Sequence, residues 1–282
     1  MAIVVITDSA SDLPPAQARE NGIEIVPLWI VFGNERLRDG IDITRATFYD
    51  RMAQSKELPH SEPLDAAGFA TVFSKHVEAG DECIVPLVGA KLSKTYENAV
   101  AGAAAFGSKV RVVDTASLSG GEGLQAVAAA EMARAGASAD EIVAALERAK
   151  ASQFGYQVMP TLEYLGRAGR LNKAIVALGT VLKVNPILQV KNGTVETAGQ
   201  TRTWEKAKEL VVDIAARNIQ DVTRTRIAVG HTHEPAVAEE ISDALRAKLG
   251  LPAKSFTLYE VGPTVAVNVG PGAVAIFSLS GI

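Results

Sequence analysis

The chain has one cysteine and little excess charge, and both shortages exclude classes of protein. Cys83 is the only cysteine among 282 residues, so the sequence offers neither a disulfide framework nor a pair of cysteine ligands for a metal. It lies in the apolar run 83–88, where we expect a buried strand residue. The formal net charge is −4 and no basic block occurs. This argues against a nucleic-acid-binding protein, because such proteins neutralise phosphates with Lys and Arg.

Long hydrophobic runs are also missing. No apolar stretch reaches the roughly 18 residues of a membrane-spanning helix, and the N-terminus begins as a strand-like run over 2–6 without a basic leader or a cleavage site. We therefore expect a cytoplasmic protein with no transmembrane segment. The sequence also lacks the G-x-x-x-x-G-K-[ST] loop that holds nucleotide phosphates.

The chain length and composition indicate a folded protein of two domains. Hydrophobic residues make up 48% and charged residues 21% of the sequence, which is ordinary for globular proteins. A chain of 282 residues exceeds the usual size of one hydrophobic core. The pattern of elements changes near residue 153, so we expect domains over 1–153 and 154–282, with a ligand site in the cleft between them.

The first half alternates short apolar runs with segments of helical spacing, which is typical of an α/β fold. The sequence predicts an N-terminal doubly wound parallel sheet in three α/β/α layers. Two helix starts, Ser119-x-x-Glu122 and Ser138-x-x-Glu141, have the form of a capping box. The expected strands are 2–6, 23–31, 82–88 and 109–113, and the expected helices are 14–21, 65–79, 92–106, 119–136 and 138–151.

The second half predicts an α/β domain with a mixed sheet. Asn192-Gly193 is a strong signal for a two-residue hairpin between two strands, and mixed strand directions follow from such a hairpin. The expected strands are 154–159, 186–190, 194–198, 226–231, 254–260 and 272–279, and the expected helices lie near 203–217 and 234–248.

Short polar turns follow several of the apolar runs. They are Thr7-Asp8-Ser9, 92–96, 114–121 and 166–170, and they gather hydroxyl groups, backbone N–H groups and arginines. In an open parallel sheet, ligands bind beyond the carboxyl ends of the strands. The pattern therefore predicts a site for an anion, either a carboxylate or a phosphate.

The order of these segments resembles the DegV family of bacterial fatty-acid-binding proteins. The opening 7–14 is similar to the family's T-D-S-x-x-D-L-P, and 92–96 is similar to its L-S-G-T-Y, with Lys94 in place of glycine. The likeness extends over the whole chain. It also rests on Ile25-Val26-Pro27-Leu28, Asp39-Gly40-x-Asp42, Ser119-x-Gly121-x-Gly123, 161–165, Gly169-Arg170-Leu171, 186–188, Arg202-Thr203 and 269–272.

The resemblance implies a noncatalytic protein that buries an acyl chain and presents its carboxylate to a partner ATP-dependent fatty acid kinase. It implies a bound long-chain fatty acid and no cofactor. By the same resemblance, the residues at the carboxylate are Ser93, Ser61, His60 and Asn268, and those that contact the kinase or a phosphate are Arg170 and Arg202. Secondary candidates for the ligand site are Ser9, Ser119, Gly270 and Gly272.

The chain departs from the family's pattern at the expected carboxylate site. His60-Ser61-Glu62-Pro63-Leu64 replaces T-S-Q-P-S, Gly89-Ala90 replaces a pair of serines, and Asn268 replaces a histidine. Glu62 matters most, because a carboxylate beside a bound carboxylate disfavours the ionised form of both unless a proton or cation intervenes.

Other interpretations of these residues stay open at this point. Ser93 and Ser119 also suit a simple helix cap, and the His231-x-His233 pair lacks a third ligand for a metal, so we expect no metal site. The alternative function is a hydrolase or phosphotransferase that acts on a small anion with Asp8, Ser9 and Asp114. A third possibility is a scaffold in which lipid only fills space. We expect a monomer or a weak dimer.

Overall fold

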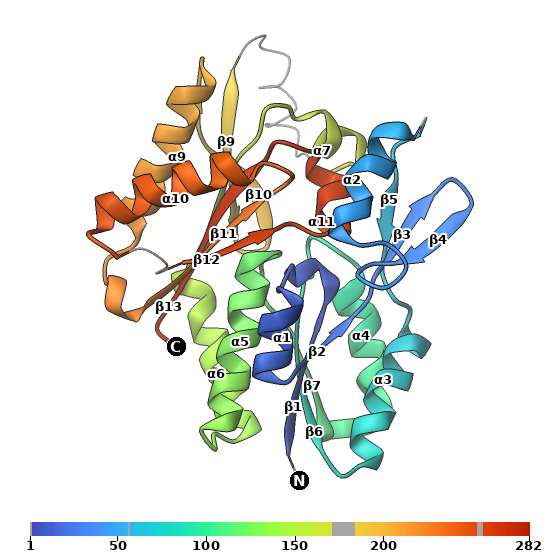
Figure 1. The fold of residues 1–282 in the computed structure, drawn as a ribbon. Helices are drawn as coiled ribbons and strands as arrows, with labels where there is room; N and C mark the ends of the chain where they lie inside the picture. The colour runs from blue at the N-terminus through green and yellow to red at the C-terminus, as the bar shows by residue number, and fades with distance from the viewer. Residues whose placement is uncertain (1, 56, 171–183, 253–255) are drawn as a thin grey trace.

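The computed structural model describes residues 2–55, 57–170, 184–252 and 256–282, and Figure 1 shows their arrangement. The first sheet has four strands in the order β2-β1-β6-β7, and all neighbouring strands are parallel. Its strands are β1 (Ile3–Asp8), β2 (Ile23–Val26), β6 (Glu82–Leu87) and β7 (Val110–Asp114). The predicted parallel sheet is confirmed.

Helices cover both faces of this sheet because its strands are apolar on both sides. Val5 and Ile84 pack on the side of α1 (Pro15–Asn21), α5 (Gly120–Arg134) and α6 (Ala139–Ala149). Ile6 and Val85 pack on the other side, against α3 (Ala66–Glu78) and α4 (Thr95–Ala103). The three predicted α/β/α layers are therefore confirmed. Cys83 is fully buried in β6, as expected.

The second sheet has six strands in the order β10-β9-β8-β13-β11-β12. Only β11 and β12 are parallel neighbours, so the predicted mixed sheet is confirmed. Asn192 and Gly193 both have positive φ, 51° and 73°, as a hairpin turn between β9 and β10 requires. The strands are β8 (Gln153–Val158), β9 (Asn185–Lys191), β10 (Thr194–Thr201), β11 (Thr225–His231), β12 (Thr257–Glu260) and β13 (Val274–Ser280). Helices α9 (Trp204–Asn218) and α10 (Pro235–Leu249) pack on one face.

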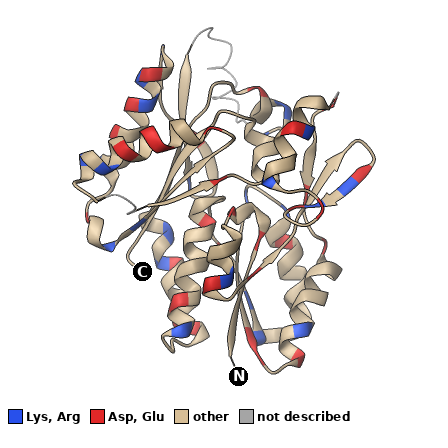
Figure 2. Cartoon of the chain, in the orientation of Figure 1, with Lys and Arg blue, Asp and Glu red and all other residues tan. Residues whose placement is uncertain are grey.

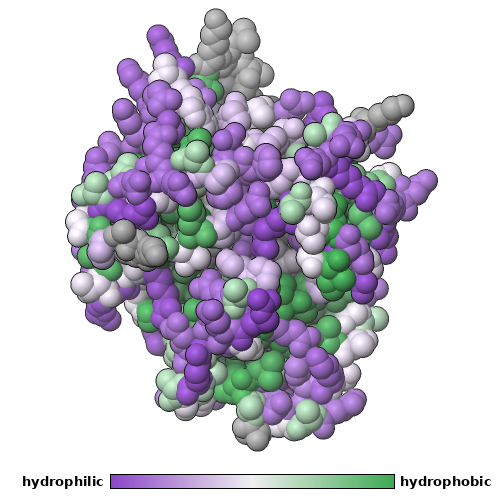
Figure 3. All heavy atoms as spheres, viewed as in Figure 1, coloured by the Kyte–Doolittle hydropathy of each residue, from purple (hydrophilic) through white to green (hydrophobic). Residues whose placement is uncertain are grey.

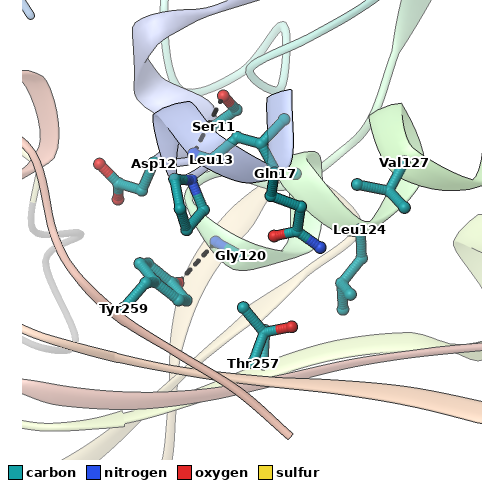
Figure 4. A pocket seen from close by; sticks show the side chains of 12 residues that line it. Ser11, Asp12, Leu13, Gln17, Gly120, Leu124, Val127, Thr257 and Tyr259 are labelled. Carbon is teal, nitrogen blue, oxygen red and sulfur yellow. Dashed lines mark hydrogen bonds between the residues drawn. The ribbon is translucent and has the colours of Figure 1, made fainter. Parts of the chain in front are cut away.

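Helix α5 lies between the two sheets. Every residue from Gly120 to Ala130 is buried, as expected for a helix with neighbours all round. A Cβ atom on Gly120 would lie 2.6 Å from the Tyr259 hydroxyl, so only glycine allows this close approach to β12. The Tyr259 hydroxyl accepts a hydrogen bond from Gly120 N at 2.8 Å (Figure 4). Helix α5 therefore packs against both sheets, and the chain continues through α6 before it enters the second sheet at β8.

A third sheet was not predicted. The expected strand over 23–31 is wrong: it is two strands, because Pro27 and the turn around it separate β2 from β3 (Trp29–Phe32). Strand β3 pairs with β4 (Glu35–Arg38) and β5 (His60–Glu62) in an antiparallel sheet, order β4-β3-β5. Further short elements are α2 (Arg45–Gln54), α7 (Glu163–Arg167), α11 (Pro263–Val269) and the 3₁₀ turns Ser9–Ser11, Ala104–Lys109, Lys150–Ser152 and Val222–Arg224.

One of the two predicted capping boxes is present. Ser138 accepts a hydrogen bond from Glu141 N, and Glu141 accepts one from Ser138 N. The box at Ser119 is wrong, because no side-chain bond caps α5 there. The Ser119 hydroxyl donates instead to Asp12 at 2.5 Å. This tertiary hydrogen bond replaces the capping bond that the local sequence pattern predicts.

Charged residues of both signs are spread over the helices, and α9 and α10 both carry acidic and basic side chains (Figure 2). Hydrophilic residues cover most of the face in Figure 3, and hydrophobic patches interrupt them. Among the helices of the described residues, none combines the length and the apolar character needed to cross a membrane.

Candidate functional site

A cavity of about 460 Å³ lies beyond the carboxyl ends of β1 and β6. Its wall takes residues from both parts of the chain. Most of the lining is apolar and includes Leu28, Val88, Leu118, Leu165, Val195 and Val265. The polar lining consists of Ser61, Glu62, Lys91, Ser93, Lys94, Gln157, Arg170, Thr264 and Asn268. A volume of this size is within the usual range for small-molecule sites, roughly 300–1,000 Å³.

Three of the four residues expected at a ligand carboxylate line this cavity. Ser61 lies in β5, Ser93 lies just before α4, and Asn268 lies in α11. The Ser93 hydroxyl contacts the Thr95 hydroxyl at 2.8 Å and accepts from Thr95 N at 3.2 Å. Ser93 therefore also satisfies the first backbone N–H group of α4, whose N-cap residue, Lys94, makes no side-chain capping bond. Asn268 donates through Nδ2 to the Thr264 carbonyl at 3.0 Å.

Arg36 compensates the charge of Glu62. The two side chains form an ion pair at 3.0 Å, and the Arg36 guanidinium lies over the Trp29 ring at 4.6 Å. Since Glu62 lines the cavity, this pair provides the cation that the sequence required beside a bound carboxylate. Arg36 was not predicted, because it belongs to the unpredicted strand β4.

Further cations lie at the same cavity. Lys91 donates to the Asn192 carbonyl at 3.1 Å, which ties the cavity wall to the β9–β10 hairpin. Lys94 and Arg170 also line the cavity. Burial lowers the pKa of the Arg170 guanidinium, which stays charged. These side chains favour an anionic ligand group.

Helix α11 is held in place by two buried acids from the first part of the chain. Asp39 accepts from Thr264 N at 3.0 Å and from the Thr264 hydroxyl at 2.6 Å. Asp12 accepts from Gly262 N, just before α11, at 2.7 Å. Burial raises the pKa of Asp12 to about 7, against the lowering effect of Arg45. These contacts position Thr264 and Asn268 in the cavity wall.

The secondary candidates for the ligand site make structural contacts, and the cavity lining does not include them. Ser9 accepts from Leu28 N at 3.1 Å and contacts the Thr264 hydroxyl at 3.0 Å. Ser119 contacts the Tyr259 hydroxyl at 2.8 Å in addition to Asp12.

Gly270 and Gly272 shape the end of α11. Gly270 has φ of +72°, and a Cβ atom there would lie 2.2 Å from the Tyr164 ring of α7. Gly272 has φ of +90°, and its Cβ would lie 2.8 Å from Pro160. These two glycines allow α11 and α7, which both line the cavity, to pack together.

His60 and Arg202 lie away from the lining. The His60 side chain is 62% exposed, and its Nε2 lies 3.5 Å from Glu62. Arg202 is exposed in the turn between β10 and α9. The expected motif 169–171 is described only as far as Arg170, and Leu171 lies outside the described residues.

The two acids of the alternative enzymatic hypothesis accept hydrogen bonds from backbone N–H groups. Asp8 is fully buried and accepts from Ala10 N at 2.7 Å and Val88 N at 3.2 Å. Burial raises the pKa of Asp8 to about 6. Asp114 accepts from Ala90 N at 3.0 Å and Ala116 N at 2.8 Å. Both carboxylates thus close the turns that shape the cavity wall.

The paired histidines also have other partners. His231 Nδ1 accepts from Glu234 N at 3.2 Å, and His233 stacks on Tyr49 at 5.0 Å. Among the described residues, no group of three or more His, Cys, Asp or Glu side chains is arranged to hold a metal ion.

Two other hollows are present in the described part of the chain. One, beside Tyr259 and Leu124 (Figure 4), has about 20 Å³, which is room for a single water molecule. The other, of about 600 Å³, lies beside β8 and β9 of the second sheet and is lined mainly by polar residues such as Gln189 and Asn218. Of these three hollows in the described residues, the 460 Å³ cavity is the one that combines a largely apolar wall with the predicted hydroxyl residues.

Comparisons with known proteins agree with this geometry. A family model described as "uncharacterised protein, DegV family" matches residues 2–281. A DegV domain-containing protein of Streptomyces coelicolor is 34% identical over 276 residues, with 97% of each chain covered. A structure of a DegV family protein from Thermus thermophilus, described by its fatty acid binding, is 30% identical and superposes with a TM-score of 0.92 over 99% of this chain and 100% of its own. A stearic-acid-binding protein from Eubacterium ventriosum is 25% identical, with a TM-score of 0.91 over 99% of this chain and 98% of its own.

Proposed function

The chain belongs to the DegV family, and on that premise we propose that it is a noncatalytic carrier of a long-chain fatty acid. The acyl chain lies in the 460 Å³ cavity, and its carboxylate is presented to a separate ATP-dependent fatty acid kinase. The fatty acid binding described for the Thermus thermophilus and Eubacterium ventriosum proteins supports the ligand class.

The observation that carries this proposal is the composition of the cavity. Side chains such as Leu28, Leu118 and Val265 offer an apolar wall, whereas Ser61, Ser93 and Asn268 offer polar groups in the same cavity. Each CH₂ group removed from water contributes about 0.8 kcal/mol, so a sixteen-carbon tail contributes roughly 12 kcal/mol before the costs of ordering. The polar groups then need only to compensate the desolvation of one carboxylate.

The polar lining suits a carboxylate. Ser61 and Ser93 supply hydroxyl donors, Asn268 supplies an amide, and Ser93 stands at the N-terminus of α4, where the helix dipole favours negative charge. The Arg36–Glu62 ion pair removes the repulsion that Glu62 would otherwise exert. His60 is exposed beside Glu62, and its proposed contribution to the carboxylate site is made through that residue.

The proposed partner supplies the ATP. The sequence has no nucleotide-binding loop of the G-x-x-x-x-G-K-[ST] form, in agreement with a nucleotide site on a second protein. Arg170 at the cavity and the exposed Arg202 would contact the kinase or the acyl phosphate, because a guanidinium binds phosphate oxygens in a bidentate geometry.

The hydrogen bonds that Asp8 and Asp114 already accept favour a carrier over a hydrolase. The hydrolase hypothesis assigns the chemistry to Asp8 and Asp114. Each of these carboxylates already accepts hydrogen bonds from two backbone N–H groups. A serine nucleophile needs a free activating base. The Ser9 hydroxyl contacts Thr264 and the carboxyl group of Asp39, and that carboxyl group already accepts two hydrogen bonds from Thr264.

Native mass spectrometry of the purified protein tests the ligand, followed by denaturing extraction and identification of any released molecule. A stoichiometric fatty acid supports the carrier and names its preferred chain. A protein that contains no lipid and acquires none from a fatty-acid mixture contradicts it.

Phosphate transfer tests the partner. Wild type loaded with fatty acid and mixed with a bacterial fatty acid kinase and ATP should yield acyl phosphate, and neither protein alone should. Arg170→Met should retain the fatty acid but lose transfer, whereas Arg167→Met, which breaks only an exposed pair with Glu163, should not. Equal transfer by both variants would contradict the assigned contact.

A further inference from the structure

Gln157 is a buried polar residue in the wall of the cavity. It lies in β8, is 7% exposed and lines the 460 Å³ cavity. The other buried glutamine, Gln125, donates to the Thr115 carbonyl at 2.9 Å and to Gln153 at 2.6 Å. No hydrogen bond joins the Gln157 side chain to a described residue. Its amide atoms are also absent from the fully enclosed atoms without a partner, which include Gln125 Oε1, so the Gln157 amide faces the cavity.

The surroundings of Gln157 are apolar. Its neighbours on β8, Tyr156 and Val158, point to the opposite face and pack in the cluster that includes α9. Its partners in adjacent strands are Leu188 in β9 and Ala275 in β13. Leu118 and Leu165 line the same cavity. On the part of the wall that the second sheet forms, the amide therefore lies beside apolar side chains that suit a hydrocarbon chain.

Such an arrangement is unfavourable for a plain acyl chain. A hydrocarbon tail that fills the cavity would remove water from the amide and would offer no partner in exchange. An amide or carbonyl left without a partner is costly, whereas one that meets a matching group is not. A primary amide has both donors and an acceptor, and a hydroxyl group complements both.

We propose that Gln157 selects a fatty acid with an oxygen substituent on its chain, a hydroxy acid above all. This inference rests on the proposed function, because it needs the acyl chain to lie in the same cavity. We assign the carboxylate to Ser61, Ser93 and Asn268. Gln157 lies on the second sheet between the apolar residues Leu188 and Ala275, and we therefore assign it to a second polar group of the ligand.

Competitive binding against a fluorescent fatty acid tests the proposal. The ligands are palmitic acid and a series of sixteen-carbon acids that differ only in the position of one hydroxyl group. At least one isomer should bind wild type about threefold to tenfold more tightly than palmitic acid does, which is the effect of one well-placed hydrogen bond. Equal or weaker binding of every isomer would overturn the proposal.

Gln157→Met is the matched variant, because methionine has a similar length and lacks the amide. It should lose the preference for the hydroxy acid and bind palmitic acid at least as tightly as wild type does. Leu165→Met conserves volume in the same wall and should keep the preference.

The outcomes separate this inference from the proposed function. Binding of palmitic acid by wild type with no preference for any isomer refutes the role of Gln157 alone. A loss of palmitic acid binding in Gln157→Met, with Leu165→Met unaffected, would place the carboxylate at Gln157 and also overturn the inference. No binding of any acid by wild type refutes the carrier function itself.

Discussion

Asp39 accepts two hydrogen bonds from Thr264, at 3.0 Å from the backbone N–H and 2.6 Å from the hydroxyl, across 225 residues of sequence. Thr264 lines the cavity and lies in α11 with Asn268. An acid in the first part of the chain thus sets the position of a helix that the second part contributes to the cavity.

Asp39→Ala should therefore weaken both the fold and ligand binding. The two lost bonds to a buried carboxylate correspond to about 2–3 kcal/mol of unfolding free energy, measurable by urea denaturation. Asp39→Asn is the control, because a single amide oxygen in the place of Oδ2 still accepts both bonds. If Asp39→Ala binds fatty acid as wild type does, α11 does not depend on this contact.

Ser93→Ala separates a ligand contact from a helix cap. Ser93 accepts from Thr95 N and lines the cavity, so the variant should lose about 1 kcal/mol of stability and bind fatty acid roughly twofold to tenfold more weakly. Ser138→Ala removes a capping hydroxyl at α6 only, and it should lower stability without changing the Kd. Equal Kd values for the two variants would mean that Ser93 stabilises the start of α4 and does not contact the ligand.

Arg36→Met tests the compensation of Glu62. With the ion pair removed, the Glu62 carboxylate faces the ligand carboxylate alone, and fatty acid affinity measured at low salt should fall by about twofold to tenfold, in keeping with a partly exposed charge. The double variant Arg36→Met/Glu62→Gln has neither charge and should recover the affinity. A double variant as weak as the single one would show that Arg36 acts through its packing on Trp29.

Much of the fold was predictable, because buried strands and amphipathic helices leave periodic patterns. The third sheet was not, since Glu35, Arg36 and Glu62 make its strands β4 and β5 polar. Helix α11 escaped prediction for the opposite reason: six of its seven residues are buried, so it shows no periodicity that marks one face.

The site divides in the same way. Ser61, Ser93, Asn268 and Arg170 followed from the resemblance to the DegV family, and the structure brings them to one cavity. Gln157 gave no signal, because a polar residue in a strand is read as a solvent-facing position. The predicted capping box at Ser119 was wrong for a related reason. Its local sequence fits a helix cap, whereas its hydrogen-bond partner, Asp12, is 107 residues away in the sequence.

Asp12→Asn tests the electrostatics of the buried acids. Burial raises the pKa of Asp12 from 3.8 to about 7, and that of Asp8 to about 6. The pKa of Glu122 is raised well above its ordinary value by burial and by Asp8. The groups that face Asp12 are Ser119, Gly262 N, Arg45 and Asp39.

A carboxyl group with a raised pKa in the folded state binds its proton more tightly there than in the unfolded chain. Its contribution to stability is therefore complete at low pH and is lost as the pH rises from about 4 to about 7, at up to about 1.4 kcal/mol per pH unit for each proton. Wild type should accordingly be less stable at pH 8 than at pH 5, as measured by urea denaturation across that range.

Asp12→Asn should flatten this dependence. Asparagine is neutral at every pH in the range, tolerates the positive φ of 52° at this position, and can accept from Gly262 N while it donates to the Ser119 hydroxyl. Asp65→Asn is the control, because Asp65 caps α3 at the surface through one accepted bond that asparagine retains. That variant should keep the wild-type slope. A slope unchanged in Asp12→Asn would mean that Asp12 is ionised throughout the range, with Arg45 outweighing its burial.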